Sequence, residues 1–102
     1  MGPLMYFDNG NEDVASFPIE TLTMIEGGND IVNLYFGNAQ QHIVVLACAD
    51  GASDVVARAL SVAISLRKDS RKIKMLTIAD DTLSTYLVTG ITGVTSITAD
   101  PA

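Results

Sequence analysis

The chain is 102 residues long, 48% hydrophobic and 18% charged, and its formal net charge at pH 7 is −6. This length fits one domain, and the apolar content excludes extensive disorder because it suffices to form a core. One cysteine and one histidine exclude an intramolecular disulfide and a four-ligand structural zinc site.

Membrane insertion and secretion are not expected. The longest uncharged apolar run, residues 43–49, is far shorter than the roughly 20 residues that a spanning helix needs. No basic region followed by a long apolar run opens the chain, so we expect no secretory signal peptide. Residues 1–4 can be an expression remnant ahead of a native start at Met5, or can be native, and they take no part in the functional argument.

The first half of the chain predicts four strands separated by polar turns. Residues 8–11 and 27–30 carry the strongest turn signals, because Asn and Gly tolerate a positive φ. Pro18 places the start of the second strand at a sheet edge. The fourth strand is a continuous apolar run, which predicts a central strand covered on both faces. The four strands are expected at residues 5–7, 17–25, 31–36 and 42–49.

Residues 51–68 predict one amphipathic helix. Its apolar residues recur at helical spacing and form one stripe that can lie on a sheet. They are Val55, Val56, Ala59, Leu60, Ala63 and Ile64. We expect Asp50 or Ser53 to cap the start of the helix, and Asp54 lies in the first turn, where the helix dipole favours an acid.

Further strands are expected after the helix, at residues 73–78, 82–89 and 94–99, rich in Thr, Val and Ile. The predicted fold class is therefore α+β, as a single domain over residues 1–102. It comprises a mostly antiparallel sheet of about six to seven strands with the helix at about 51–68 packed on one face.

No residue is assigned a catalytic, cofactor-binding or metal-binding role. Cys48 could be a nucleophile with His42 as base, but positions six apart in one strand lie about 20 Å apart, so a buried core cysteine is favoured. The junction at 49–53 lacks the glycine and lysine pattern of a phosphate loop. Asp80-Asp81 lacks calcium-loop spacing, so we expect a solvated turn rather than a metal site.

The charges divide along the chain. Residues 1–57 hold eight acids and no base, a net charge of −8, whereas residues 58–102 hold four acids and all six bases, a net charge of +2. Five of the bases fall in one segment and form the candidate interface or anion-contact site. They are Arg67, Lys68, Arg71, Lys72 and Lys74.

Three interpretations of this basic segment stay open. It can be a solvated helix end whose cations match the helix dipole. It can contact the phosphates of a nucleic acid or a small ligand, although the acidic remainder of the chain makes nucleic acid a poor expectation. It can also contact the acidic half of a neighbouring copy, in a head-to-tail interface that closes into a ring or propagates. We expect the partner to be another copy of the chain, which would also cover exposed strand edges.

The order of the pieces carries a family resemblance. A strand that ends Leu34-Tyr35-Phe36 is followed by a strand over 44–51 and by a helical segment over 52–60. In this order, residues 17–66 resemble small uncharacterised proteins of marine tailed phages. The resemblance includes no catalytic motif and no functional residues. It implies a small accessory or virion-associated protein without a known reaction. Because no catalytic motif is present, we expect a non-enzymatic, self-assembling module, and because neither a signal peptide nor a spanning segment is expected, we place it in the cytoplasm or the virion.

Overall fold

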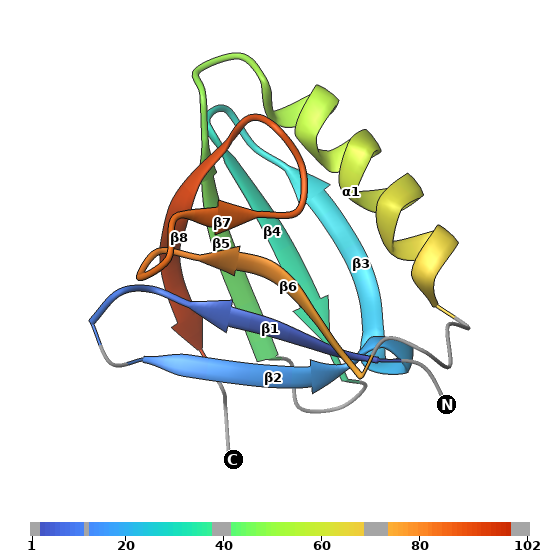
Figure 1. Cartoon of the computed structure of the whole chain (residues 1–102). Coiled ribbons are helices and arrows are strands. Elements are labelled where there is room, and N and C mark those ends of the chain that lie inside the picture. Colours follow the sequence, from blue (N-terminus) through green and yellow to red (C-terminus); the bar gives the residue numbers. More distant parts are fainter. Residues whose placement is uncertain (1–2, 12, 38–41, 69–73, 99–102) are drawn as a thin grey trace.

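The computed structural model describes residues 3–11, 13–37, 42–68 and 74–98. These residues form eight strands, one α-helix and one short 3-10 helix, in an α+β fold (Figure 1). In chain order the elements are β1 (Leu4–Asp8), β2 (Val14–Pro18), η1 (Ile19–Thr21), β3 (Leu22–Gly27), β4 (Ile31–Phe36), β5 (His42–Cys48), α1 (Ser53–Arg67), β6 (Met75–Asp80), β7 (Thr85–Tyr86) and β8 (Ile91–Thr98).

The strands form two sheets of four strands each rather than one. One sheet has the order β2-β1-β6-β7, and the other has the order β3-β4-β5-β8. Pairing is antiparallel except between β1 and β6, the one parallel pair among the described strands. Because β1 lies beside β6, the beginning of the chain is built into the same sheet as the segment that follows α1.

The core lies between the two sheets and α1. Three phenylalanines join the sheets: the rings of Phe17 and Phe36 stack with centroids 4.4 Å apart, and Phe7 meets both edge-on, at 6.1 and 5.9 Å. Each such ring pair contributes about 0.5–1.5 kcal/mol beyond the area it buries. Each sheet therefore turns one apolar face inward against the other.

β5 is the strand for which the predicted burial is wrong. The strand is central, as predicted, because it pairs with β4 and with β8. However, only Val44, Leu46 and Cys48 are buried, and the residues between them are half-buried. The helix packs along β3 and reaches β4 instead of covering the outer face of β5, so an uninterrupted apolar run here does not indicate two covered faces.

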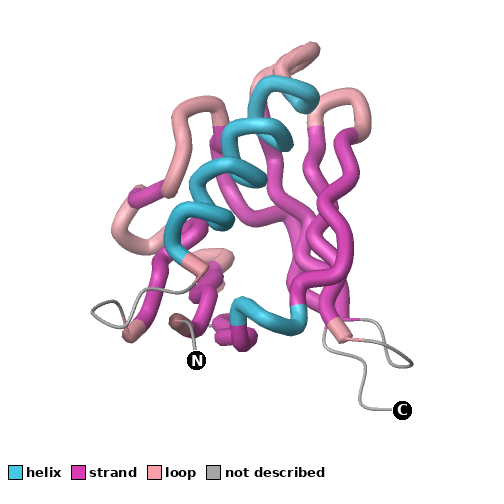
Figure 2. Tube along the Cα trace, turned by 90° about the vertical axis from the view of Figure 1, so that its right-hand side faces the viewer, coloured by secondary structure: helices cyan, strands magenta, loops and turns pink. Residues whose placement is uncertain are grey.

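α1 packs on the sheets through Val56, Leu60 and Ile64, which are buried (Figure 2). The loop before β8 supports this contact at Gly90, whose φ is +110°, and a Cβ atom there would lie 2.7 Å from Cγ2 of Val56. Between α1 and β3 remains a groove of about 200 Å³ whose walls include Leu22.

The predicted capping of α1 is wrong. The N-cap residue is Ala52, and no side chain caps the helix. Gly51, at φ +78°, donates its N–H to the Asn29 carbonyl, and the N–H of Ala52 bonds the Ala49 carbonyl. This backbone turn places Ala52 rather than Asp50 or Ser53 at the cap. Asp54 lies in the first turn and Arg67 in the last, as the helix dipole favours.

The other strand predictions are correct in part. The strand expected over 17–25 is split into the end of β2, η1 and β3, and residues 82–89 contribute only β7. The strand predicted at 73–78 begins, and the strand predicted at 94–99 ends, at a residue that lies outside the described ones. Residues 3 and 4 belong to the fold: Pro3 is buried and its carbonyl accepts the N–H of Ile19, while Leu4 belongs to β1.

Candidate interaction surfaces

The five basic residues of the predicted site are only partly described. Arg67 and Lys68 end α1, and Lys74 precedes β6, whereas Arg71 and Lys72 lie outside the described residues. The Nη1 atom of Arg67 donates to the Ala63 carbonyl at 2.9 Å, so part of this guanidinium binds its own helix.

A second apolar face of α1 points away from the sheets. Val55, Val62 and Leu66 are 62%, 55% and 77% exposed, unusually high values for large apolar side chains that share a surface. They line a shallow hollow of about 490 Å³ together with two arginines. We define the helix surface as Val55, Arg58, Ala59, Val62, Ala63, Leu66 and Arg67.

The sequence holds a signal for this face. Positions 55, 59, 62 and 66 are spaced by four, three and four residues, the spacing of the contact positions of a coiled coil. The prediction of one apolar stripe is wrong because Val55 and Val56 lie on different faces of the helix: Val56 is 1% exposed and Val55 is 62% exposed. Val62 and Leu66 are not part of the predicted stripe, yet they belong to the exposed face.

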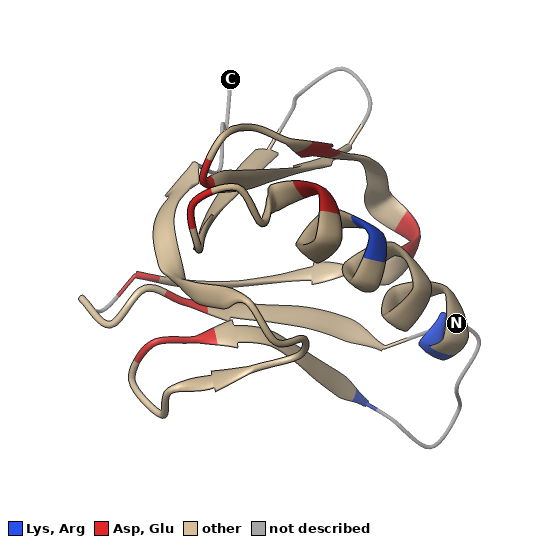
Figure 3. Cartoon of the chain, turned by 90° about the horizontal axis from the view of Figure 1, so that it is seen from above, with Lys and Arg blue, Asp and Glu red and all other residues tan. Residues whose placement is uncertain are grey.

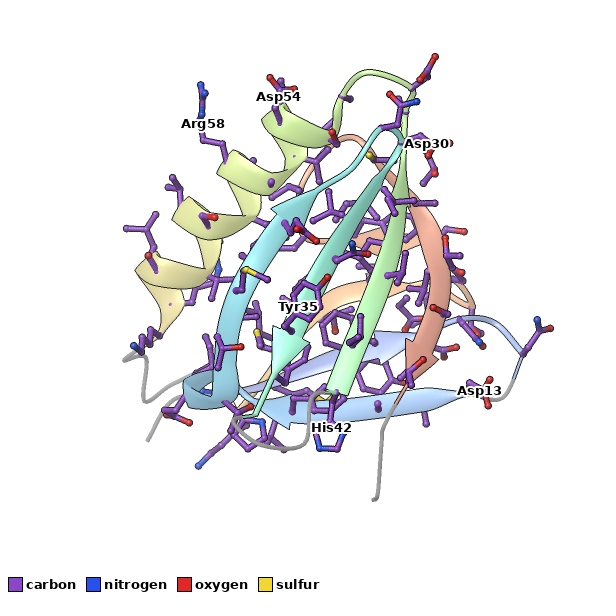
Figure 4. All side chains as sticks on the ribbon, turned by 180° about the vertical axis from the view of Figure 1, so that it is seen from behind. Asp13, Asp30, Tyr35, His42, Asp54 and Arg58 are labelled. Carbon is purple, nitrogen blue, oxygen red and sulfur yellow. The ribbon has the colours of Figure 1, made fainter. Side chains whose placement is uncertain are left out.

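The helix surface carries positive charge at its borders. Arg58 is exposed and projects outward from α1 (Figure 4), and it forms no hydrogen bond or ion pair with the residues that the structure describes. No carboxylate is among the residues that line the hollow. Asp54 lies one turn before Arg58, at the N-terminal border of the surface. The described Lys and Arg gather on this side of the molecule (Figure 3).

A second candidate surface forms where the sheet of β1 and β6 ends. Val14, Asp8, Asp80 and Thr85 lie side by side in one row across its four strands. Two turns follow this row, one described at residues 9–11 and 13 and the other at 81–84, and they are adjacent, because the N–H of Asp81 donates to the Asp8 carbonyl at 2.9 Å.

These two turns combine acids with exposed apolar side chains. Leu83 is 72% exposed and Val14 is 55% exposed. Asp13 is exposed and Asp81 is half-buried. We define the turn surface as Asp13, Val14, Asp81 and Leu83. Acidic positions at these turns lie on the side of the molecule away from α1 (Figure 3).

The prediction that Asp80-Asp81 forms a solvated turn is wrong. Asp80 is only 6% exposed, and its Oδ1 atom accepts the N–H of Leu83 at 3.1 Å. Ser84 then closes the turn with a left-handed φ of +53°. These carboxylates hold the turn that presents Leu83, a role that a pair of adjacent acids in a sequence does not disclose.

Asp81 connects this turn to both sheets. It accepts the phenolic O–H of Tyr86 at 2.7 Å and the backbone N–H of Val94, which lies 3.0 and 3.2 Å from its two oxygens. The bond to Asp81, with burial and nearby negative charge, raises the pKa of the Tyr86 phenol. The position of Leu83 is therefore fixed from both ends of its turn.

The cysteine that the sequence singles out lies in the core, far along β5 from the histidine. Cys48 is buried, as predicted, and burial followed by the charge of Asp30 raises the pKa of its thiol. His42 lies at the opposite end of β5. Within the described residues no group of three or more His, Cys, Asp or Glu side chains is arranged to hold a metal ion.

Comparisons of the chain with protein-family models, curated proteins and solved structures found no match. No helix in the described part of the chain has the length and apolar character needed to cross a membrane.

Proposed function

We propose that this protein is a non-enzymatic, self-assembling interaction module. The observation that supports the proposal is the helix surface, on which Val55, Val62 and Leu66 are each more than half exposed. A monomer gains nothing from an apolar face directed at water, whereas an oligomer buries it. With the resemblance to tailed-phage proteins, the proposed setting is a virion-associated or accessory role, in the virion or the cytoplasm.

The free energy gained by burying the helix surface can be compared with the cost of association, and the difference is what a partner must contribute. Complete burial of one Val or Leu side chain contributes roughly 1.5–3 kcal/mol, and the exposed fractions of these three add to about two side chains, so covering them contributes roughly 3–6 kcal/mol. Loss of translational and rotational freedom on association costs about 4–15 kcal/mol. The helix surface alone therefore does not suffice, and its partner must contribute complementary apolar and charged groups.

The experiment that tests this function is light-scattering chromatography at low and high salt on the wild type and two variants. Leu66→Ser removes the most exposed apolar side chain of the helix surface. Met75→Ser is the matched control, because Met75 is also a large apolar residue, 52% exposed, and begins β6 in the other sheet. The proposal predicts oligomers for the wild type and the control and a monomer for Leu66→Ser. A monomeric wild type under every condition contradicts it.

The alternative function is binding of nucleic acid or a small anionic ligand through residues 67–74. It is supported by the placement of Arg67, Lys68 and Lys74 at the two borders of this segment and by the gathering of the described bases on one side (Figure 3). It predicts a labelled oligonucleotide that binds in low salt, with an affinity that falls steeply as salt rises. The fluorescence anisotropy of the labelled oligonucleotide measures this binding. A rise in anisotropy on addition of the protein supports the alternative function, and no rise in low salt contradicts it.

A further inference from the structure

We infer that copies of this chain assemble head to tail, with the turn surface of one copy docked on the helix surface of the next. The inference rests on the proposed function and names its partner surface. It is supported by two apolar surfaces of opposite charge on one chain. The helix surface is lined by Arg58 and Arg67 with no carboxylate. The turn surface contains Asp13 and Asp81 with no base.

The two surfaces have complementary shapes: the turn surface presents a protruding side chain and the helix surface presents a hollow. Leu83 projects from the tip of a tight turn and is 72% exposed, so it can enter a shallow hollow. The hollow on α1 is floored by small side chains, Ala59 and Ala63, between the larger Val62 and Leu66. An apolar knob placed among such residues is the arrangement by which helices receive side chains from a partner. Docking buries apolar surface on both copies. It therefore adds the apolar contribution that the helix surface needs from its partner for a stable contact.

The charges favour this pairing over contact between two helices related by a two-fold axis. A two-fold α1–α1 contact brings the helix surface of one copy to the same surface of the other, so four arginines, two from each copy, enter one interface, and among the described residues only Asp54 at the border of each surface offsets them. In the head-to-tail contact, Arg58 and Arg67 instead meet the acids of the turn surface. Arg58 makes no ion pair with the described residues, so its guanidinium is available for this contact.

The placement of the surfaces determines how assembly proceeds. The turns that end β1 and β6 lie on one side of the molecule and α1 lies on the other (Figure 1). Each copy that binds through its turn surface leaves its helix surface open for the next copy. A contact of this kind continues to a closed ring or an open filament instead of ending at a dimer. The average mass is therefore expected to rise with protein concentration.

The experiment that tests the inference uses two variants separately and mixed. Leu66→Glu disables the helix surface, because it places an acid against Asp13 and Asp81. Leu83→Lys disables the turn surface, because it places a base against Arg58 and Arg67. Both side chains are mostly exposed, at 77% and 72%, so neither substitution opens the core. Met75→Glu and Met75→Lys are the controls for a charge of either sign added at another exposed apolar position. Circular dichroism and the urea midpoint verify that each variant is folded.

Head-to-tail assembly predicts that each variant alone is monomeric, with association weakened at least tenfold, and that an equimolar mixture forms a one-to-one complex. The complex forms because the Leu66→Glu chain keeps its turn surface and the Leu83→Lys chain keeps its helix surface. The complex cannot grow, since its two remaining surfaces are disabled. Sedimentation velocity of the mixture measures this outcome directly.

Other outcomes overturn the inference in distinguishable ways. If Leu83→Lys assembles as the wild type does while Leu66→Glu does not, the helix surface pairs with something other than the turn surface, and self-assembly stands without the head-to-tail contact. If both variants are monomeric and their mixture forms no complex, the two surfaces are not partners. If the wild type itself stays monomeric, the proposed function and this inference both fail.

Discussion

Removal of the phenolic hydroxyl of Tyr86 tests how the turn surface is held. In the wild type this hydroxyl donates to the Asp81 carboxylate at 2.7 Å, and the side chain is half-buried. Hydrogen bonds to charged groups contribute roughly 1.5–3 kcal/mol, and partial exposure places this bond near the lower end. We expect Tyr86→Phe to lower the free energy of unfolding by about 1.5 kcal/mol.

Replacement of Asp81 should cost more than replacement of Tyr86. Asp81→Ala removes the bond from Tyr86 and also leaves the N–H of Val94 without its acceptor, on a residue that is only 7% exposed. The expected loss is about 2–4 kcal/mol, since an unsatisfied buried donor adds its own penalty. In the Asp81→Ala background, Tyr86→Phe should have little further effect, because only the long contact of the hydroxyl with the Thr92 carbonyl, at 3.4 Å, is left to lose.

The assay is urea unfolding of the wild type, both single variants and the double variant, followed by circular dichroism. Tyr35→Phe is the control: its hydroxyl also donates to a carboxylate, that of Glu26 at 2.9 Å, and Tyr35 is half-buried like Tyr86, but Glu26 is exposed and the bond lies at the surface. It should cost less than Tyr86→Phe. Equal losses for the two phenylalanine variants, or additive losses for the Tyr86 and Asp81 substitutions, would refute the assignment of Asp81 as the connecting residue.

Three further predictions concern the core and the titrating groups. Leu60→Ala should destabilise the fold by about 2–5 kcal/mol in urea unfolding, because Leu60 is fully buried, whereas Leu66→Ala on the opposite face should change stability little; equal losses would contradict the two-faced helix. The thiol of Cys48 should react with a chromogenic disulfide reagent only on unfolding, since burial hinders access and raises the pKa of the thiol; rapid labelling of the folded chain would contradict this. The pKa of all three tyrosines is raised in the fold, so the folded state holds phenolic protons more tightly than the unfolded state, with its pKa of about 10. Stability should therefore be intact below about pH 10 and fall as pH rises through the folded pKa values, and a thermal midpoint that rises there would contradict the sign.

The helix was the element that the sequence determined best. Its periodicity and its polar borders predict residues 51–68, and the structure has α1 at Ser53–Arg67. The two-faced character was missed because the apolar positions were assigned to one stripe, although Val55 and Val56 are adjacent and a helix turns about 100° between neighbours. The spacing of Val62 and Leu66 from Val55 could have disclosed the outer face.

The division into two sheets could not be obtained from local patterns. The strand predicted over 17–25 joins the last two residues of β2 (Val14–Pro18) to the following segment and leaves residues 14–16 out, because nothing in the sequence marks η1 as a break between strands in different sheets. The parallel pairing of β1 with β6 joins residues about seventy positions apart, and turn signals specify only neighbouring strands. A period-2 pattern identifies a strand but not its partner.

The turn at Asp80-Asp81 is the part of the candidate surfaces for which the prediction from the sequence is wrong. Adjacent acids at a strand end are ordinarily solvated, yet Asp80 is buried by its neighbours in a row across four strands. That burial depends on sheet order, so it follows from tertiary structure alone. The exposure of Leu83 has the same origin, because the bonds at Asp80 and Asp81 fix the turn around it.

The measurement that tests self-assembly most directly is sedimentation equilibrium of the wild-type chain over a hundredfold range of concentration at physiological salt. The chain has a mass of 10.8 kDa. Self-assembly through the helix surface predicts a weight-average mass that rises above this value with concentration, and that stays at it for Leu66→Glu. A wild-type mass of 10.8 kDa at every concentration would contradict the proposed function.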